Sequence, residues 1–105
     1  MNRFEYIKWF WKYIDNETPV LLFYEVDLEN ERYATRMTEV FPDKSAVHRI
    51  EEGFEFITEA PVPTVEQINS EPEFYAEKIS KEEFEKVYEV DKYKGDIIFP
   101  KRRSF

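Results

Sequence analysis

Short apolar segments separated by polar turns occupy the first 60 residues, and this spacing constrains the fold more than any other feature of the sequence. Residues 15–19 and 42–45 are rich in Asp, Asn, Ser and Pro, which favour turns because Pro fixes φ and the short polar side chains accept turn geometry. Between the turns, apolar and polar residues alternate, as in strands with one buried face. The pattern predicts a meander of about five antiparallel strands, over residues 4–14, 20–27, 31–41, 46–50 and 54–58.

The first predicted strand, residues 4–14, carries large apolar side chains on both faces. A helix would fit the same spacing, but the turn that follows favours a hairpin. We expect one face to pack on the helices that carry Phe74, Phe84 and Val87. The other face is either covered, as in a core strand, or exposed as an aromatic patch that binds a protein. Trp9 and Trp11 are the candidate partner-binding residues of such a patch.

After residues 60–63, the spacing of the apolar residues changes from one typical of strands to one typical of helices. Thr64 with Gln67 and Ser80 with Glu83 have the spacing of capping boxes, which predicts two helix starts. Pro72 is suited to the first turn of a further short helix. The sequence therefore predicts an α+β fold, in which two or three short C-terminal helices pack on one face of the sheet.

We expect a single domain over residues 1–91 and a basic C-terminal extension over residues 92–105. Within this extension, residues 97–99 could add a short edge strand. The extension has five basic residues and one acid, although the net charge of the chain is −8, so residues 1–91 are more acidic still. A domain with this negative charge repels the phosphate backbone of nucleic acids. The charge therefore argues against direct nucleic-acid binding and favours a basic protein partner.

The residues for common catalytic and cofactor chemistry are sparse. There is no Cys, which removes disulfides and thiolate zinc sites and favours a cytoplasmic protein. No apolar run is long enough to span a membrane. With two glycines there is no phosphate-binding loop, and no metal-ligand spacing occurs. We therefore expect no enzyme activity, no metal and no cofactor.

The remaining polar candidates have simple structural interpretations. His48 is the only histidine and is predicted to be a structural or surface residue, because the chain has no Cys and none of its serines lies in a nucleophile-elbow context. Arg32 and Arg36 are expected to pair with Glu25 or Glu39 across strands, although ligand binding is an alternative. Four acids bracket one predicted turn and are expected to form a solvated hairpin tip, and the alternative is a catalytic or cation-binding site. They are Glu25, Asp27, Glu29 and Glu31.

The stretch from 71 to 91 contains eight acids and three lysines. Such a stretch is usually a solvated face, but it can also form an acidic docking surface. The candidate docking residues are Glu71, Glu73, Glu82, Glu83, Glu85 and Glu89.

Several short segments also resemble a small bacterial domain family of unknown function. They are residues 20–27, 31–33 with Arg36 and Glu39, then 59–64, Glu66, 68–69, 72–74, 79–80 and 83–84. The resemblance covers about Tyr6 to Tyr88 and implies a compact domain, for which an immunity-type protein is one expectation, without supplying an activity. Lys44 after Asp43, and Gly53 standing alone, depart from the family pattern, so the hairpin over 45–58 is expected to differ.

These observations favour a small acidic protein-binding module. The expected function is that of an inhibitor or immunity protein, as in a toxin–antitoxin pair, which neutralises a basic partner such as a nuclease toxin. The alternative is a ligand-binding or homo-oligomerising domain without catalysis, and a homodimer is a possible form of it.

Overall fold

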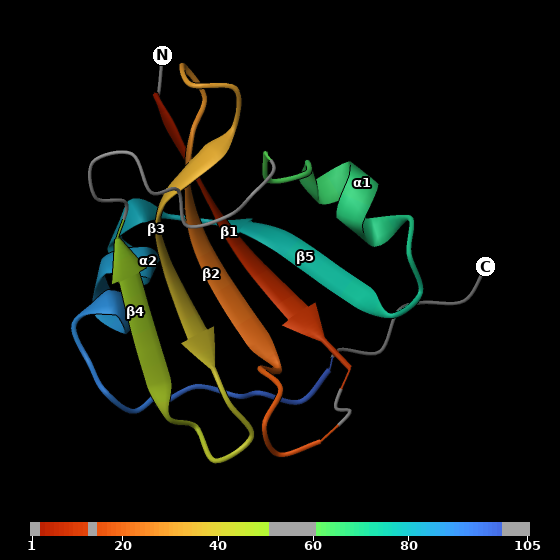
Figure 1. Cartoon of the computed structure of the whole chain (residues 1–105), viewed down its shortest axis with the longest axis vertical. Helices are drawn as coiled ribbons and strands as arrows, with labels where there is room; N and C mark the ends of the chain where they lie inside the picture. The colour runs from red at the N-terminus through yellow and green to blue at the C-terminus, as the bar shows by residue number, and fades with distance from the viewer. Residues whose placement is uncertain (1–2, 13–14, 51–60, 100–105) are drawn as a thin grey trace.

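The computed structural model describes residues 3–12, 15–50 and 61–99, which form one antiparallel sheet and two short helices (Figure 1). The strands are β1 (Phe4–Trp11), β2 (Leu21–Asp27), β3 (Tyr33–Val40), β4 (Ala46–Ile50) and β5 (Phe74–Ile79). The helices are α1 (Val65–Asn69) and α2 (Lys81–Tyr88). The order across the sheet is β4-β3-β2-β1-β5. The first four strands are the predicted meander, and the predicted strand over 54–58 lies outside the described residues.

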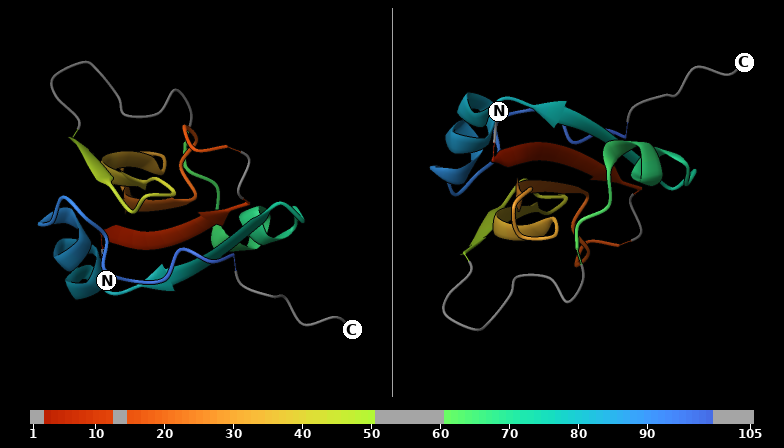
Figure 2. Two further views of the ribbon diagram at one scale, coloured as in Figure 1. Left: turned by 90° about the horizontal axis from the view of Figure 1, so that it is seen from below. Right: turned by 90° about the horizontal axis from the view of Figure 1, so that it is seen from above.

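The fifth strand corrects the prediction of a helix after Pro72. Residues 74–79 form β5, which pairs antiparallel with β1, so that Trp9 lies opposite Ala76. Aromatic and β-branched residues in this segment suit a strand, and the pairing with β1 outweighs the helix-start signal of Pro72. β5 also separates α1 from α2, and Figure 2 shows the helices at opposite ends of this strand.

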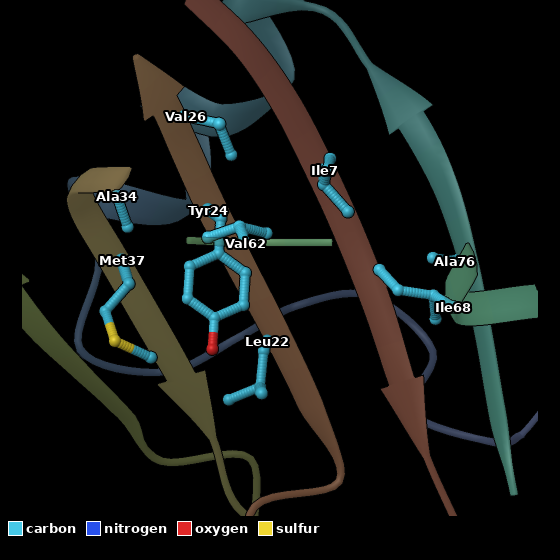
Figure 3. Close-up of a cluster of buried hydrophobic side chains, with 9 residues drawn as sticks. All are labelled: Ile7, Leu22, Tyr24, Val26, Ala34, Met37, Val62, Ile68 and Ala76. Carbon is cyan, nitrogen blue, oxygen red and sulfur yellow. The ribbon is translucent and has the colours of Figure 1, made fainter. Parts of the chain in front are cut away.

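The sheet is covered on both faces. One face contributes Ile7, Leu22, Tyr24, Val26, Ala34, Met37 and Ala76 to a cluster closed by Val62 and by Ile68 of α1 (Figure 3). The other face contributes Tyr6, Phe10, Leu21, Phe23 and Val40 to a cluster closed by Phe84 of α2. The expectation that the helices share one face is therefore wrong. A sheet that is apolar on both faces needs a cover on each, because apolar surface gains free energy only when it leaves water.

Both predicted helix starts are confirmed. Thr64 and Gln67 form a complete capping box, with Gln67 N–H donating to Thr64 Oγ1 at 3.1 Å and Thr64 N–H donating to Gln67 Oε1 at 2.9 Å. Ser80 Oγ accepts from Glu83 N–H at 3.1 Å. These bonds satisfy backbone donors that the first helical turn leaves unpaired.

The segment after α2 runs back along the sheet rather than away from it. Tyr93, Ile97 and Phe99 pack against the cluster that includes Phe84. Residues 97–99 form no strand, because Asp96 Oδ1 accepts from Ile98 N–H at 3.0 Å and holds a bend there. Within the described part of the chain, no helix is long and apolar enough to cross a membrane.

Candidate functional site

A surface cleft of about 680 Å³ lies where β1 begins and where β5 leads into α2. Its apolar lining comes from Phe4, Leu28 and Ile79, and its charged lining from Arg3, Glu5, Lys78, Lys81 and Glu82. Leu28 is 41% exposed, so part of its apolar surface is accessible in the cleft. The cleft therefore combines accessible apolar surface with a charged rim, as binding sites commonly do.

Several charges around the cleft are already neutralised within the chain. Arg3 donates to both carboxylate oxygens of Asp27, at 3.2 and 3.0 Å, and lies 3.4 Å from Glu29. The hydrogen bonds from Arg3 lower the pKa of Asp27. Glu5 accepts from Arg32 at 3.2 Å and lies 4.0 Å from Lys78. Lys81 and Glu82 form no ion pair within the described residues, so their charges are available to a partner.

Behind the cleft, a charged cluster joins β2 and β3 to α2. Arg36 donates to Glu25 at 3.0 and 2.6 Å and to Glu85 of α2 at 3.3 and 2.6 Å. Its guanidinium also lies over the rings of Phe84 and Tyr88, at 5.0 and 4.9 Å from their centroids. This cluster fixes where α2 sits on the sheet, and so fixes one wall of the cleft.

A β-bulge explains how two neighbouring residues of β3 reach the same carboxylate. The register between β2 and β3 shifts at Glu25 and Val26, so Thr35 is the extra residue. Thr35 Oγ1 donates to Glu25 at 2.7 Å from beside Arg36, and Tyr6 Oη donates to it at 2.8 Å. Nothing in the sequence pattern signals this bulge.

The environment of Glu25 sets its ionisation. Burial by itself would raise the pKa of Glu25, but hydrogen bonds from Arg36, Thr35 and Tyr6 outweigh burial and lower it. Burial and the nearby Glu25 carboxylate raise the pKa of Tyr6 to about 12. Glu25 is therefore an ion and Tyr6 a neutral donor at neutral pH. Their hydrogen-bonding capacity is used within the fold, which leaves neither poised as an acid or base.

The interpretation of the four hairpin acids is partly corrected. Glu29 and Glu31 are exposed, as expected, but Glu25 and Asp27 are buried, at 7% and 3% exposure. Burial of these carboxylates is tolerated because Arg36 and Arg3 neutralise them. Sequence spacing could not show this, since Arg3 is 24 residues from Asp27.

The two candidate arginines differ in what they bind. Arg36 pairs with Glu25, as predicted. Arg32 does not join that pair: it donates to the carbonyls of Val62 and Pro63 at 2.9 and 3.2 Å and to Glu5. It therefore holds the segment before α1 against the sheet. Glu39, the other expected partner, pairs with Arg49 instead, at 2.7 Å.

His48 lies between hydrogen-bonding groups of two other segments. Its Nε2 donates to the Val90 carbonyl at 2.6 Å, and its Nδ1 bonds to the Thr38 hydroxyl at 2.7 Å. Because a carbonyl only accepts, the proton must be on Nε2. The ring also packs on Tyr88, with 4.9 Å between centroids. These contacts tie β4 to the chain beyond α2, in keeping with the predicted structural role.

The two candidate tryptophans lie in packed surroundings. Trp9 and Trp11 are half-buried and contact each other and Phe74, with ring centroids 5.3 to 5.9 Å apart. Both belong to the rim of the cluster that includes Ile68 of α1. Their indole N–H groups are buried and make no hydrogen bond. The two rings are therefore partly covered by their neighbours, and partner binding through Trp9 and Trp11 stays a prediction.

The candidate acidic residues do not form one surface. Glu71 and Glu73 are exposed in the turn before β5, whereas Glu82, Glu83 and Glu89 are exposed on or just after α2. The six residues of β5 separate the two groups by roughly 17–20 Å. Glu85 faces Arg36 and is not free. Of the predicted set, only Glu82 lines the cleft.

The described residues contain no group of three or more His, Cys, Asp or Glu side chains that could hold a metal ion. What they bring together is the cleft, the charged cluster behind it and the exposed acids in the first turn of α2.

These features define a small α+β domain built on one antiparallel sheet. The chain belongs to a family described as a domain of unknown function (DUF6881), whose model matches residues 5–92. The resemblance to an uncharacterised domain family is thereby confirmed. No curated protein and no solved structure matches the chain.

Proposed function

We propose that this chain is a protein-binding module of the inhibitor type, and that it docks through the cleft and the first turn of α2. The observation that carries the proposal is the coincidence of accessible apolar surface and unpaired acids. Leu28 is exposed in the cleft, while Glu82 and Glu83 are exposed beside it and form no ion pair among the described residues. Interfaces commonly have this arrangement of an apolar centre and a polar rim.

The charge of the chain supports a basic partner. A net charge of −8 on 105 residues produces a field that attracts a positively charged protein and accelerates encounter. An immunity-type protein that blocks a basic nuclease toxin is the partner class that fits best. In such a pair, the acidic domain occupies the groove that the toxin uses for the phosphate backbone.

The network around Arg36 supports a rigid docking surface. Glu85 and the rings of Phe84 and Tyr88 hold α2 through one arginine. A wall fixed before binding lowers the entropic cost of association, because few side chains must be ordered when the complex forms.

Co-expression with the product of the neighbouring gene tests the proposal first, because an inhibitor must be made together with its target. We expect a 1:1 complex and loss of the partner's toxicity or nuclease activity.

In this complex, the double substitution Glu82→Lys and Glu83→Lys should lower the association rate constant about tenfold at low salt. The difference should shrink at high salt, where charges are screened. Stopped-flow fluorescence measures the rate.

Glu66→Lys is the matched control, because Glu66 is an exposed acid on α1, which packs on the other face of the sheet. It should change the association rate much less than the double substitution. An equal effect of both variants would mean that net charge alone matters and that α2 is not the docking face. A neighbouring protein that remains active and unbound would remove the inhibitor proposal.

A further inference from the structure

Strand β1 extends beyond the strand that borders it. β1 begins at Phe4, but its pairing with β5 begins only at Tyr6, opposite Ile79. At Ser80 the chain leaves the sheet and enters α2. The position beside Phe4, where β5 would continue, is therefore not occupied by β5. The cleft lies at this position.

The alternation of backbone directions shows which groups of β1 face this gap. Arg3 C=O accepts from Leu28 N–H at 2.8 Å and Trp11 N–H donates to Val20 C=O at 2.9 Å, so the odd-numbered residues of β1 bond towards β2. Even-numbered residues then direct their N–H and C=O towards β5. The backbone N–H and C=O of Phe4 consequently point to the side of the cleft, two residues beyond Tyr6 in the last pair.

The lining of the cleft suits an extended chain with an apolar side chain. Phe4, Leu28 and Ile79 supply the apolar surface. Arg3 pairs with Asp27, and Glu5 pairs with Arg32 and lies 4.0 Å from Lys78. Beside α2, the rim has Lys81 and Glu82, with Glu83 next to them, and these two acids form no ion pair among the described residues. Lysine or arginine next to the apolar residue of an incoming segment would complement this rim.

We propose that the cleft receives an extended segment of the protein partner, which continues the line of β5 and hydrogen-bonds to the backbone of Phe4. An apolar side chain of the segment packs on Leu28 and Ile79, and a neighbouring lysine or arginine lies beside Glu82. Addition of a strand to an open sheet position is a common mode of peptide recognition, in which backbone bonds provide affinity and side-chain pockets provide specificity. The inference rests on the proposed function and specifies how the partner is bound.

Selection of phage-displayed random 12-residue peptides on the whole chain tests this inference without the natural partner. We expect enriched peptides with an apolar residue next to Lys or Arg. Leu28→Ser should weaken the best peptide about tenfold, because it removes accessible apolar surface from the cleft. Val47→Ser is the matched control, since Val47 is also 41% exposed but lies on β4, at the other edge of the sheet. It should change the affinity less than twofold.

Hydrogen exchange followed by NMR distinguishes strand addition from other modes of binding. The Phe4 amide should exchange at least tenfold more slowly in the peptide complex, and it should show cross-strand contacts with the peptide. Enriched peptides that leave the Phe4 amide unprotected, an absence of enrichment, or a self-association that Leu28→Ser abolishes would each overturn the inference. If the Glu82 and Glu83 reversals slow binding of the protein partner while Phe4 stays unprotected, the proposed function stands and strand addition fails.

Discussion

At the scale of single residues, Arg36 contacts more elements of the fold than the sequence pattern predicted. It joins Glu25 in β2 to Glu85 in α2 and lies over two aromatic rings of the helix. The pair with Glu25 was predictable, because the two residues lie on neighbouring strands. The pair with Glu85 was not, because 49 residues separate it from Arg36 and no local pattern links them.

Replacement of Arg36 should be costly. Arg36→Met leaves Glu25 nearly buried without its cation, and we expect the free energy of unfolding to fall by about 3 kcal/mol. Arg49→Met is the control, because the Arg49 side chain is 58% exposed in its pair with Glu39. An exposed pair of this kind contributes less than about 1 kcal/mol. Urea denaturation of both variants measures the difference, and equal losses would show that the Arg36 cluster is no more stabilising than a surface pair.

At the scale of secondary-structure elements, α1 protects the outer edge of the sheet. Asn69, the last residue of α1, uses its side-chain amide as a substitute for a neighbouring strand. Its Oδ1 accepts from Ala76 N–H at 2.7 Å and its Nδ2 donates to Ala76 C=O at 2.9 Å. An edge strand with unpaired backbone groups can pair with other chains, so this cap reduces unwanted association.

Removal of the cap should expose the edge at one defined place. In Asn69→Ala we expect faster hydrogen exchange at the Ala76 amide and a loss of about 1–2 kcal/mol in the free energy of unfolding. Gln67→Ala is the control, because it disrupts the capping box of the same helix, and the side chain that hydrogen-bonds to Ala76 in the described chain is that of Asn69 and not that of Gln67. Exchange at Ala76 that is accelerated equally in both variants would show that the stability of α1, and not the Asn69 amide, protects the edge.

At the scale of the whole molecule, carboxylates that accept hydrogen bonds from arginine link stability to pH. Hydrogen bonds from arginine lower the pKa of Asp27 and Glu85, and those from Arg36, Thr35 and Tyr6 lower the pKa of Glu25 against the effect of burial. Each group therefore binds a proton less tightly in the folded chain than in the unfolded chain. Its contribution to stability is complete above its ordinary pKa and is lost as the pH falls through the lowered folded value.

We accordingly expect the free energy of unfolding to decrease as the pH falls below about 4.5, the ordinary pKa of a glutamate. Urea denaturation between pH 7 and pH 3 measures this slope. Arg36→Met should show a shallower decrease, because Glu25 and Glu85 lose the cation that lowers their pKa values. A variant whose stability falls as steeply as that of the parent chain would show that other carboxylates carry the acid sensitivity.

The sequence by itself determined the features that depend on neighbouring residues. The turns at 15–19 and 42–45 separate strands of the meander, and Thr64 and Ser80 begin the two helices, because turn and cap chemistry acts over a few residues. Only the tertiary structure decided that 74–79 is a strand, that the helices cover opposite faces, and that Glu25 and Asp27 are buried. These features depend on pairings between distant residues, such as Trp9 with Ala76 and Arg3 with Asp27. The cleft also depends on such a distant pairing, because it lies where β1 begins two residues beyond its last pair with β5.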